Sequence, residues 1–123
     1  MKFYIFVLFI FRRGFDSHYG FWTGGQLYSS HMRTSTSKPL TLGYDFRDND
    51  EVDEEAFGEY SAHLFARRTQ RIIRSRAEQN DTSPLFLYLA FQSVHSPVEV
   101  PKKYEEPYQH VEVKEILPSQ CST

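Results

Sequence analysis

The residue best suited to chemistry in this sequence is His95, which follows a continuous apolar run at residues 85–91. Such a run is typical of a parallel strand buried on both faces, and ligands gather beyond the carboxyl ends of such strands. An imidazole placed there can donate or accept a proton near neutral pH. A lone histidine at a strand end is more often a hydrogen-bonded structural residue, so position alone leaves both interpretations open.

The other reactive side chains show no arrangement that suits a metal or a nucleophile. The single cysteine, Cys121, excludes an internal disulfide. Residues 45–55 hold seven acidic side chains, which we interpret as a solvated face rather than a metal site. The remaining histidines share no spacing that suits zinc and are predicted to be surface or packing residues: His18, His31, His63 and His110.

Composition bounds the class of protein without naming a partner. A chain of 123 residues can form one small domain with a modest core. Its 14 basic and 16 acidic residues nearly cancel, so the net charge favours neither nucleic acid nor a membrane surface. The pattern Asn80-Asp81-Thr82 fits an acceptor for N-glycosylation. It predicts glycosylation at Asn80 and hints at secretion.

An amphipathic helix is predicted over residues 57–76, just before the apolar run. Acidic residues crowd its start and arginines its second half, as the helix dipole prefers. Its arginines are explained by solvation, although binding of a sulfated or phosphorylated polymer is an alternative. At 100° per residue the apolar side chains share one face and three arginines point away: Ala62, Phe65, Ala66, Thr69, Ile72 and Ile73 against Arg67, Arg71 and Arg74.

The apolar stretch at residues 3–11 has three interpretations. It is about half of the ~20 residues that a membrane-spanning helix needs, so we predict no membrane span. Its length suits the central region of a signal peptide, but no small-x-small cleavage site follows. The alternatives are a buried strand or an unrelated start. It is the only other candidate strand, so the 85–91 strand lacks at least one neighbour, and we expect a poorly folded or aggregation-prone chain.

Several segments, taken in order, resemble the sulfatase family, most closely its arylsulfatase B branch with the arylsulfatase I and J-like relatives. The likeness runs from about residue 12 to residue 111, whereas residues 1–11 and 112–123 do not share it. We therefore predict an apolar N-terminal segment (1–11), an internal piece of a sulfatase catalytic domain (12–111) and an unrelated tail (112–123). The matching segments are residues 13–16, 19–20, Tyr28 with Ser30 and His31, 45–48 with 51–52, 84–90 and 92–95.

The resemblance implies an α/β fold: a partial piece of an alkaline-phosphatase-like sulfatase domain, with one long amphipathic helix, one buried central strand and long loops. It implies a lysosomal or secreted hydrolase of sulfate esters, in the closest branch those of N-acetylgalactosamine 4-sulfate in glycosaminoglycans. Family members use formylglycine, made from a cysteine, and a bound calcium ion. The histidine matching His95 contacts the sulfate and assists departure of the alcohol.

Departures from the family pattern limit what this chain can do. The formylglycine motif is absent, because Cys121 is followed by Ser122 and Thr123 rather than by the proline and arginine of the motif. The paired aspartates, the Asp-Asn metal ligands and the sulfate-binding lysines of the family have no match either. We therefore expect an inactive chain that holds neither cofactor and no confidently assigned substrate-binding residue. A non-catalytic binder of sulfated glycans and a short membrane-associated product are the alternatives.

Overall fold

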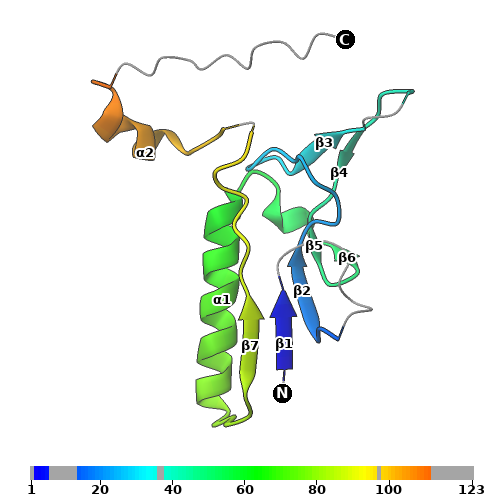
Figure 1. Ribbon diagram of the computed structural model, residues 1–123, viewed down its shortest axis with the longest axis vertical. Coiled ribbons are helices and arrows are strands. Elements are labelled where there is room, and N and C mark those ends of the chain that lie inside the picture. The colour runs from blue at the N-terminus through cyan, green and yellow to red at the C-terminus, as the bar shows by residue number, and fades with distance from the viewer. Residues whose placement is uncertain (1, 6–13, 36–37, 97, 112–123) are drawn as a thin grey trace.

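A five-stranded sheet carries the parallel strands that position His95. The computed structural model describes residues 2–5, 14–35, 38–96 and 98–111 (Figure 1). Its strand order is β6-β5-β2-β1-β7, with β1 parallel to both β2 and β7 and with β5 antiparallel to β2 and β6. The carboxyl ends of the three parallel strands therefore share one edge. The strands are β1 (Lys2–Ile5), β2 (Ser17–Gly20), β5 (Arg47–Asp48), β6 (Glu51–Val52) and β7 (Leu85–Tyr88).

Smaller elements lie beyond the carboxyl edge of the parallel strands. A separate antiparallel pair, β3 (Met32–Thr34) and β4 (Leu42–Tyr44), projects there (Figure 1). The 3-10 turn η1 (Glu54–Ala56) precedes the long helix. The segment after β7 carries α2 (Lys102–Glu105) and the 3-10 turn η2 (Glu106–Tyr108). Loops, rather than long strands, thus build this end of the molecule.

The predicted amphipathic helix is confirmed as α1 (Ser61–Glu78), which begins four residues later than expected. Gly58 adopts a φ of 86°, a conformation that glycine reaches without strain, and this turn separates η1 from α1. At the other end Asn80 takes a φ of 50°, a left-handed conformation often used to end helices. Only part of the predicted apolar face is covered, because Phe65 and Ile72 are buried whereas Ile73 is 52% exposed.

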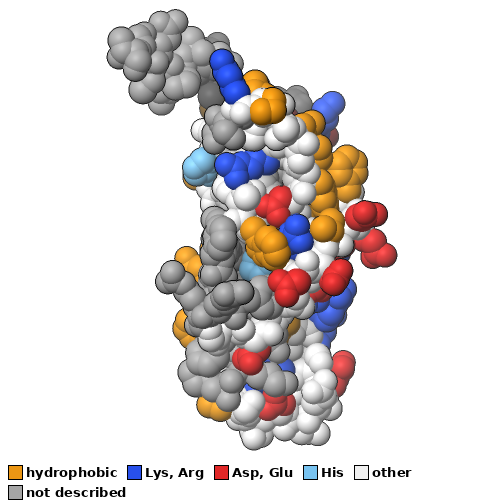
Figure 2. All heavy atoms as spheres, turned by 90° about the vertical axis from the view of Figure 1, so that its right-hand side faces the viewer, with side chains coloured by type: hydrophobic (Ala, Val, Ile, Leu, Met, Phe, Trp, Pro, Cys, Tyr) orange, Lys and Arg blue, Asp and Glu red, His pale blue; other side chains and the backbone are white. Residues whose placement is uncertain are grey.

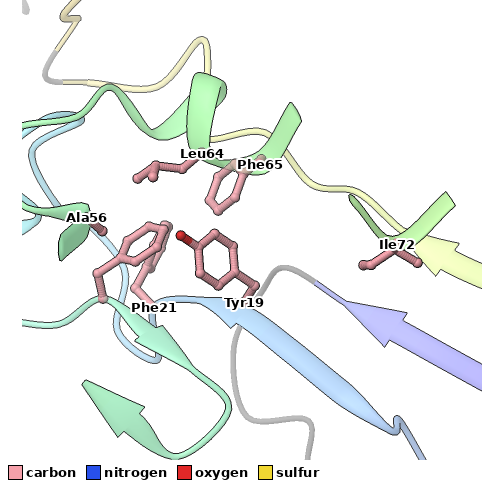
Figure 3. Packing of buried hydrophobic residues seen from close by; sticks show 7 residues of the cluster. Tyr19, Phe21, Ala56, Leu64, Phe65 and Ile72 are labelled. Atoms are coloured by element: carbon pink, nitrogen blue, oxygen red, sulfur yellow. The ribbon is translucent and has the colours of Figure 1, made fainter. Parts of the chain in front are cut away.

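Aromatic side chains form the centre of the core between α1 and the sheet (Figure 3). Phe46 and Phe65 are fully buried, with ring centroids 5.9 Å apart. Tyr19 on β2 meets Phe46 edge-on at 5.1 Å. Burying a phenylalanine side chain contributes roughly 1.5–3 kcal/mol. Contacts between the helix and the β2–β5 side of the sheet therefore hold α1 in place.

The structure corrects one prediction about β7. The apolar run was expected to be buried on both faces, but β7 lies at the edge of the sheet with β1 as its one strand neighbour among the described residues. Leu87 packs against the core, whereas Phe86 and Tyr88 are 45% and 50% exposed. The α/β class is confirmed, and the exposure of β7 agrees with the expectation that a neighbour is missing.

The N-terminal stretch is a strand where the structure describes it. Residues 2–5 form β1, between β2 and β7, which matches the strand interpretation of residues 3–11. Residues 6–11 lie outside the described part. Among the described residues, none of the helices combines the length and the apolar character needed to cross a membrane.

Candidate functional site

His95 lies in the loop that follows β7, beyond the carboxyl edge of the parallel strands, with its side chain exposed. Its Nδ1 is 2.7 Å from the carbonyl oxygen of Ser96. Because a carbonyl only accepts hydrogen bonds, Nδ1 carries a proton in this arrangement. The other ring nitrogen, Nε2, has no protein partner in the described part of the chain. A second proton on Nε2 would therefore be available to an incoming group.

The hydroxyl of Tyr28 holds the backbone at His95 and at Gln92, three residues before it. It accepts a hydrogen bond from the amide of His95 at 2.9 Å. It also lies 2.7 Å from the carbonyl oxygen of His95 and 3.1 Å from that of Gln92, and it donates its one proton to this pair. Tyr28 is 2% exposed, and its ring stacks on Tyr60 with centroids 5.8 Å apart. A buried and immobile hydroxyl thus holds the loop that presents the histidine.

Two further contacts tie this loop to the segment around Tyr28 and to α1. The side-chain amide of Gln92 donates to the carbonyl of Gln26 at 2.6 Å, and its oxygen accepts from the hydroxyl of Ser61 at 3.0 Å. After His95, the carboxylate of Glu99 accepts from the amide of Tyr28 at 2.7 Å. The chain is therefore anchored before and after His95. The sequence marked Tyr28 and Gln92 only as matching positions and gave no signal for these contacts.

Several acidic side chains of residues 45–55 accept hydrogen bonds from other parts of the chain, so the stretch is not simply the solvated face that we predicted. Asp45 accepts from the amide of Thr23 at 2.9 Å, Asp48 accepts from Arg68 at 2.8 Å, and Asp53 accepts from the hydroxyl of Tyr19 at 3.0 Å. No group of three His, Cys, Asp or Glu side chains could hold a metal ion within the described ranges. Asp45, Asp48 and Asp53 are instead engaged by protein donors.

The arginines of α1 differ in the contacts that they make. Arg67 holds Glu59 through two hydrogen bonds, at 2.5 and 2.8 Å. Arg76 contacts Asp81 at 2.7 Å at the end of the helix. Arg71 and Arg74 are exposed and line a shallow cavity of about 280 Å³. Ion pairs thus engage Arg67 and Arg76, whereas the explanation of the helix arginines by dipole and solvation stays a prediction.

The other histidines confirm their prediction as packing or surface residues. The buried ring of His31 places Nε2 3.0 Å from the carbonyl oxygens of both Ala56 and Glu59, so Nε2 carries the proton. Burial lowers the pKa of His31 and, likewise, the pKa of His18. His63 meets the hydroxyl of Tyr104 at 2.9 Å. His110, on the last described stretch, is exposed.

Comparison with known proteins bears on this arrangement. The profile of the family described as "Sulfatase" matches residues 3–116, a span that takes in parts of the terminal segments that we placed outside the likeness. "Arylsulfatase J" of Mus musculus is 37% identical over 101 residues, which cover 81% of this chain and 16% of the relative. The chain thus spans about a sixth of that relative.

A solved structure shares the fold of this chain. The crystal structure of Ps i-CgsB in complex with k-i-k-neocarrahexaose superposes with a TM-score of 0.70. The match covers 93% of this chain and 28% of that chain, at 19% sequence identity. At 19% identity this likeness shows a shared fold and nothing more. The shared fold extends over 93% of this chain.

Replacing Tyr28 tests how the loop is held. In Tyr28→Phe the amide of His95 loses its acceptor and its carbonyl loses a donor, while the ring still fills its buried site. We expect the amide of His95 to exchange with deuterium about tenfold faster or more, since leaving such groups unpaired costs about 1–3 kcal/mol. Tyr60→Phe, which removes only a 3.3 Å contact to Ser93, is the matched control. Equal exchange rates in all three proteins would contradict the clamp.

The burial of His31 predicts a loss of stability in acid. An unfolded histidine takes up a proton as the pH falls below about 6.5, whereas folded His31, with its lowered pKa, resists it. The unfolded state therefore gains protons first. The contribution of neutral, folded His31 to stability is therefore full above pH 6.5. It declines below that pH, by at most about 1.4 kcal/mol per pH unit.

We expect His31→Gln to reduce this decline, measured as the free energy of unfolding in urea at pH 7.5 and pH 5. His18 is also buried, and its lowered pKa contributes to the part that remains. His63→Gln is the control, because its half-buried ring bonds a tyrosine at the surface. A pH dependence unchanged in His31→Gln would show that this ring does not govern the acid response.

Proposed function

The chain belongs to the sulfatase family, and from this membership we propose that it forms the histidine-bearing part of a sulfatase catalytic domain. In this proposal His95 contacts the sulfate ester and assists departure of the alcohol. The observation that carries it is the fixed presentation of His95 at the carboxyl edge of the sheet. Its Nδ1 is held by Ser96, and its Nε2 has no partner among the described residues.

Hydrolysis of a sulfate ester requires an attack on sulfur and a proton for the departing alcohol oxygen. A protonated Nε2 of His95 can supply that proton, while the contact between Nδ1 and Ser96 sets the orientation of the ring. The clamp by Tyr28 keeps the backbone of this donor in place, and such positioning lowers the entropy cost of reaching the transition state. The proton donor and the contacts that position it thus come from this chain, whereas the attacking group does not.

The attacking group has no counterpart in this sequence. Family members carry it as formylglycine, and the one cysteine here lacks the neighbours of that motif. When bound in the family, calcium neutralises the oxygens of the sulfate, but the described residues offer no cluster to hold it. We therefore propose that the chain by itself does not hydrolyse sulfate esters and that the remainder of a sulfatase domain supplies these groups.

A sulfated glycan is the substrate class that we propose for the complete domain. The name of the mouse relative denotes an arylsulfatase, and the fold neighbour was crystallised with a neocarrahexaose. Within that class we propose N-acetylgalactosamine 4-sulfate, from the resemblance to the arylsulfatase B branch. The alternative of a purely glycan-binding helix has Arg71 and Arg74 in its favour, whereas Arg67 is engaged by Glu59.

We also propose a lysosomal or secreted location with a glycan on Asn80. The side chain of Asn80 is exposed directly after α1, and Thr82 of the same pattern is exposed as well. An exposed turn leaves room for a bulky sugar. We expect the chain, when directed into the secretory pathway of mammalian cells, to lose apparent mass on treatment with an N-glycosidase. Asn80→Gln should remove this shift, and a shift that persists in the variant would contradict the assignment.

A chimera tests the catalytic proposal. Residues 14–111 replace the segment that they match in mouse arylsulfatase J, and turnover of an aryl sulfate is measured. We expect the isolated chain to show no turnover and the chimera to be active. His95→Ala in the chimera should lower kcat/KM roughly 100-fold or more, the size of effect of a general acid. His63→Ala, a surface histidine, is the control.

Two outcomes would overturn the proposal in different ways. Turnover by the isolated chain that disappears in His95→Ala would show that the chain is active without the rest of the domain. A chimera that is secreted and folded, yet equally active with and without His95, would remove the proposed role from this histidine.

A further inference from the structure

A second cavity lies at the same end of the molecule as His95, between the loop after β2 and the β3–β4 pair. It measures about 490 Å³, which is within the range of small-ligand sites. Trp22 follows the end of β2 as His95 follows the end of β7, so both belong to the carboxyl edge of the parallel strands. On this side of the molecule basic, acidic and apolar side chains lie next to one another (Figure 2).

Two arginines give this cavity its charge. The guanidinium of Arg47 stacks on the indole of Trp22, 4.0 Å from the ring centroid. Its Nε contacts Asp45 at 3.3 Å and one terminal nitrogen donates to the carbonyl of Asp50 at 2.9 Å. The other terminal nitrogen has no protein partner within the described residues. Arg47 is therefore held at three points, by Trp22, Asp45 and Asp50, with one terminal nitrogen left over.

Arg33 on β3 supplies the second cation. It makes no ion pair with any carboxylate in the described part of the chain, unlike Arg67, Arg68 and Arg76 of the helix. It lines the cavity together with the hydroxyl-bearing Thr41. A guanidinium presents a planar fork of donors that matches two oxygens of a sulfate or carboxylate group.

Asp45 supplies the one carboxylate among the described residues that line the cavity, and its oxygens are already engaged. Asp45 is 15% exposed and accepts hydrogen bonds from the amides of Trp22 and Thr23, at 3.2 and 2.9 Å, and from the hydroxyl of Thr23 at 2.5 Å. With Arg47 these donors satisfy its oxygens. Among the described residues the cavity therefore presents Arg33 without an ion pair, Arg47 with one terminal nitrogen left over, and an aromatic ring, which together favour an anionic sugar.

Hydrogen bonds connect this cavity to the loop of His95. The side-chain amide of Gln26 donates to the carbonyl of Asp45, and the carbonyl of Gln26 accepts from Gln92 at 2.6 Å. Gln92 lies on the loop that Tyr28 clamps around His95. The cavity and the histidine thus belong to one continuous hydrogen-bonded framework.

We propose that Arg33, Arg47 and Trp22 form an accessory subsite for an anionic sugar unit of a sulfated glycan whose reacting unit lies at His95. This subsite deepens the proposed function and rests on it for the identity of the glycan. The sulfate or the uronate carboxylate of the sugar lies between the guanidinium groups. The position of the subsite along the carboxyl edge makes it a determinant of specificity rather than of the chemical step.

The single tryptophan of the chain allows a direct test, because Trp22 alone accounts for its tryptophan fluorescence. The purified chain is titrated with a chondroitin 4-sulfate hexasaccharide at low ionic strength. We expect a saturable change in emission that weakens as salt is added. Unsulfated chondroitin hexasaccharide, which keeps the carboxylates, separates the two anions: weaker binding assigns the sulfate, and equal binding assigns the carboxylate.

Variants locate the binding. Arg33→Gln should raise the Kd about tenfold, the size expected for the loss of a charge-assisted hydrogen bond. Arg33→Lys keeps the positive charge but not the planar fork of donors. Its Kd should therefore lie between those of the parent chain and Arg33→Gln. Arg74→Gln, an exposed arginine on α1, is the matched control and should bind like the parent chain. No saturable change, or equal losses in Arg33→Gln and Arg74→Gln, would overturn the subsite.

This test is independent of turnover. If the hexasaccharide binds at Trp22 but the chimera is inactive, the subsite stands and the catalytic proposal fails. If the chimera is active and the hexasaccharide leaves the fluorescence unchanged, the catalytic proposal stands and the subsite fails.

Discussion

The hydroxyl of Tyr28 is the contact on which the arrangement at the carboxyl edge depends. It meets the backbone before and at His95 across 64 and 67 residues of sequence. Few other restraints are available there, because β7 has a single strand neighbour among the described residues and its outer face is exposed. The loop is thus positioned from the side of residues 26–28 and the start of α1, rather than by the strand that leads into it.

The position of the hydrophobic core accounts for this dependence, because the core lies away from β7. The buried aromatic residues join α1 to β2 and to the residues just before β5, while β7 contributes Leu87 only at the margin. The β2 side of the sheet is consequently the stable frame. Residues 21–31 continue the chain from the end of β2. Through the contacts of Tyr28 they connect this stable side of the sheet to the loop of His95. Trp22 and His95 are both fixed by this one segment.

Local patterns in the sequence identified α1 and the location of His95, because helical periodicity and an apolar run are encoded by neighbouring residues. The resemblance to the family predicted the α/β class, which the structure and the comparisons support. The partners of Tyr28 and the structural role of Asp45 could not be predicted, since they join residues far apart in sequence. The exposure of β7 differs from prediction for another reason: burial depends on neighbouring strands, and periodicity does not show whether these are present.

The proposed role of His95 and the fold place opposite demands on histidine protonation. Proton donation by His95 needs a protonated imidazole, whereas the core needs neutral rings. Acidic conditions oppose the buried neutral rings of His31 and His18, whose pKa values are lowered by burial. His31 supports the chain through two carbonyls near the start of α1, beside the residues that hold Tyr28. A protein that uses His95 as an acid therefore has to keep His31 and His18 buried and neutral while His95 carries its proton.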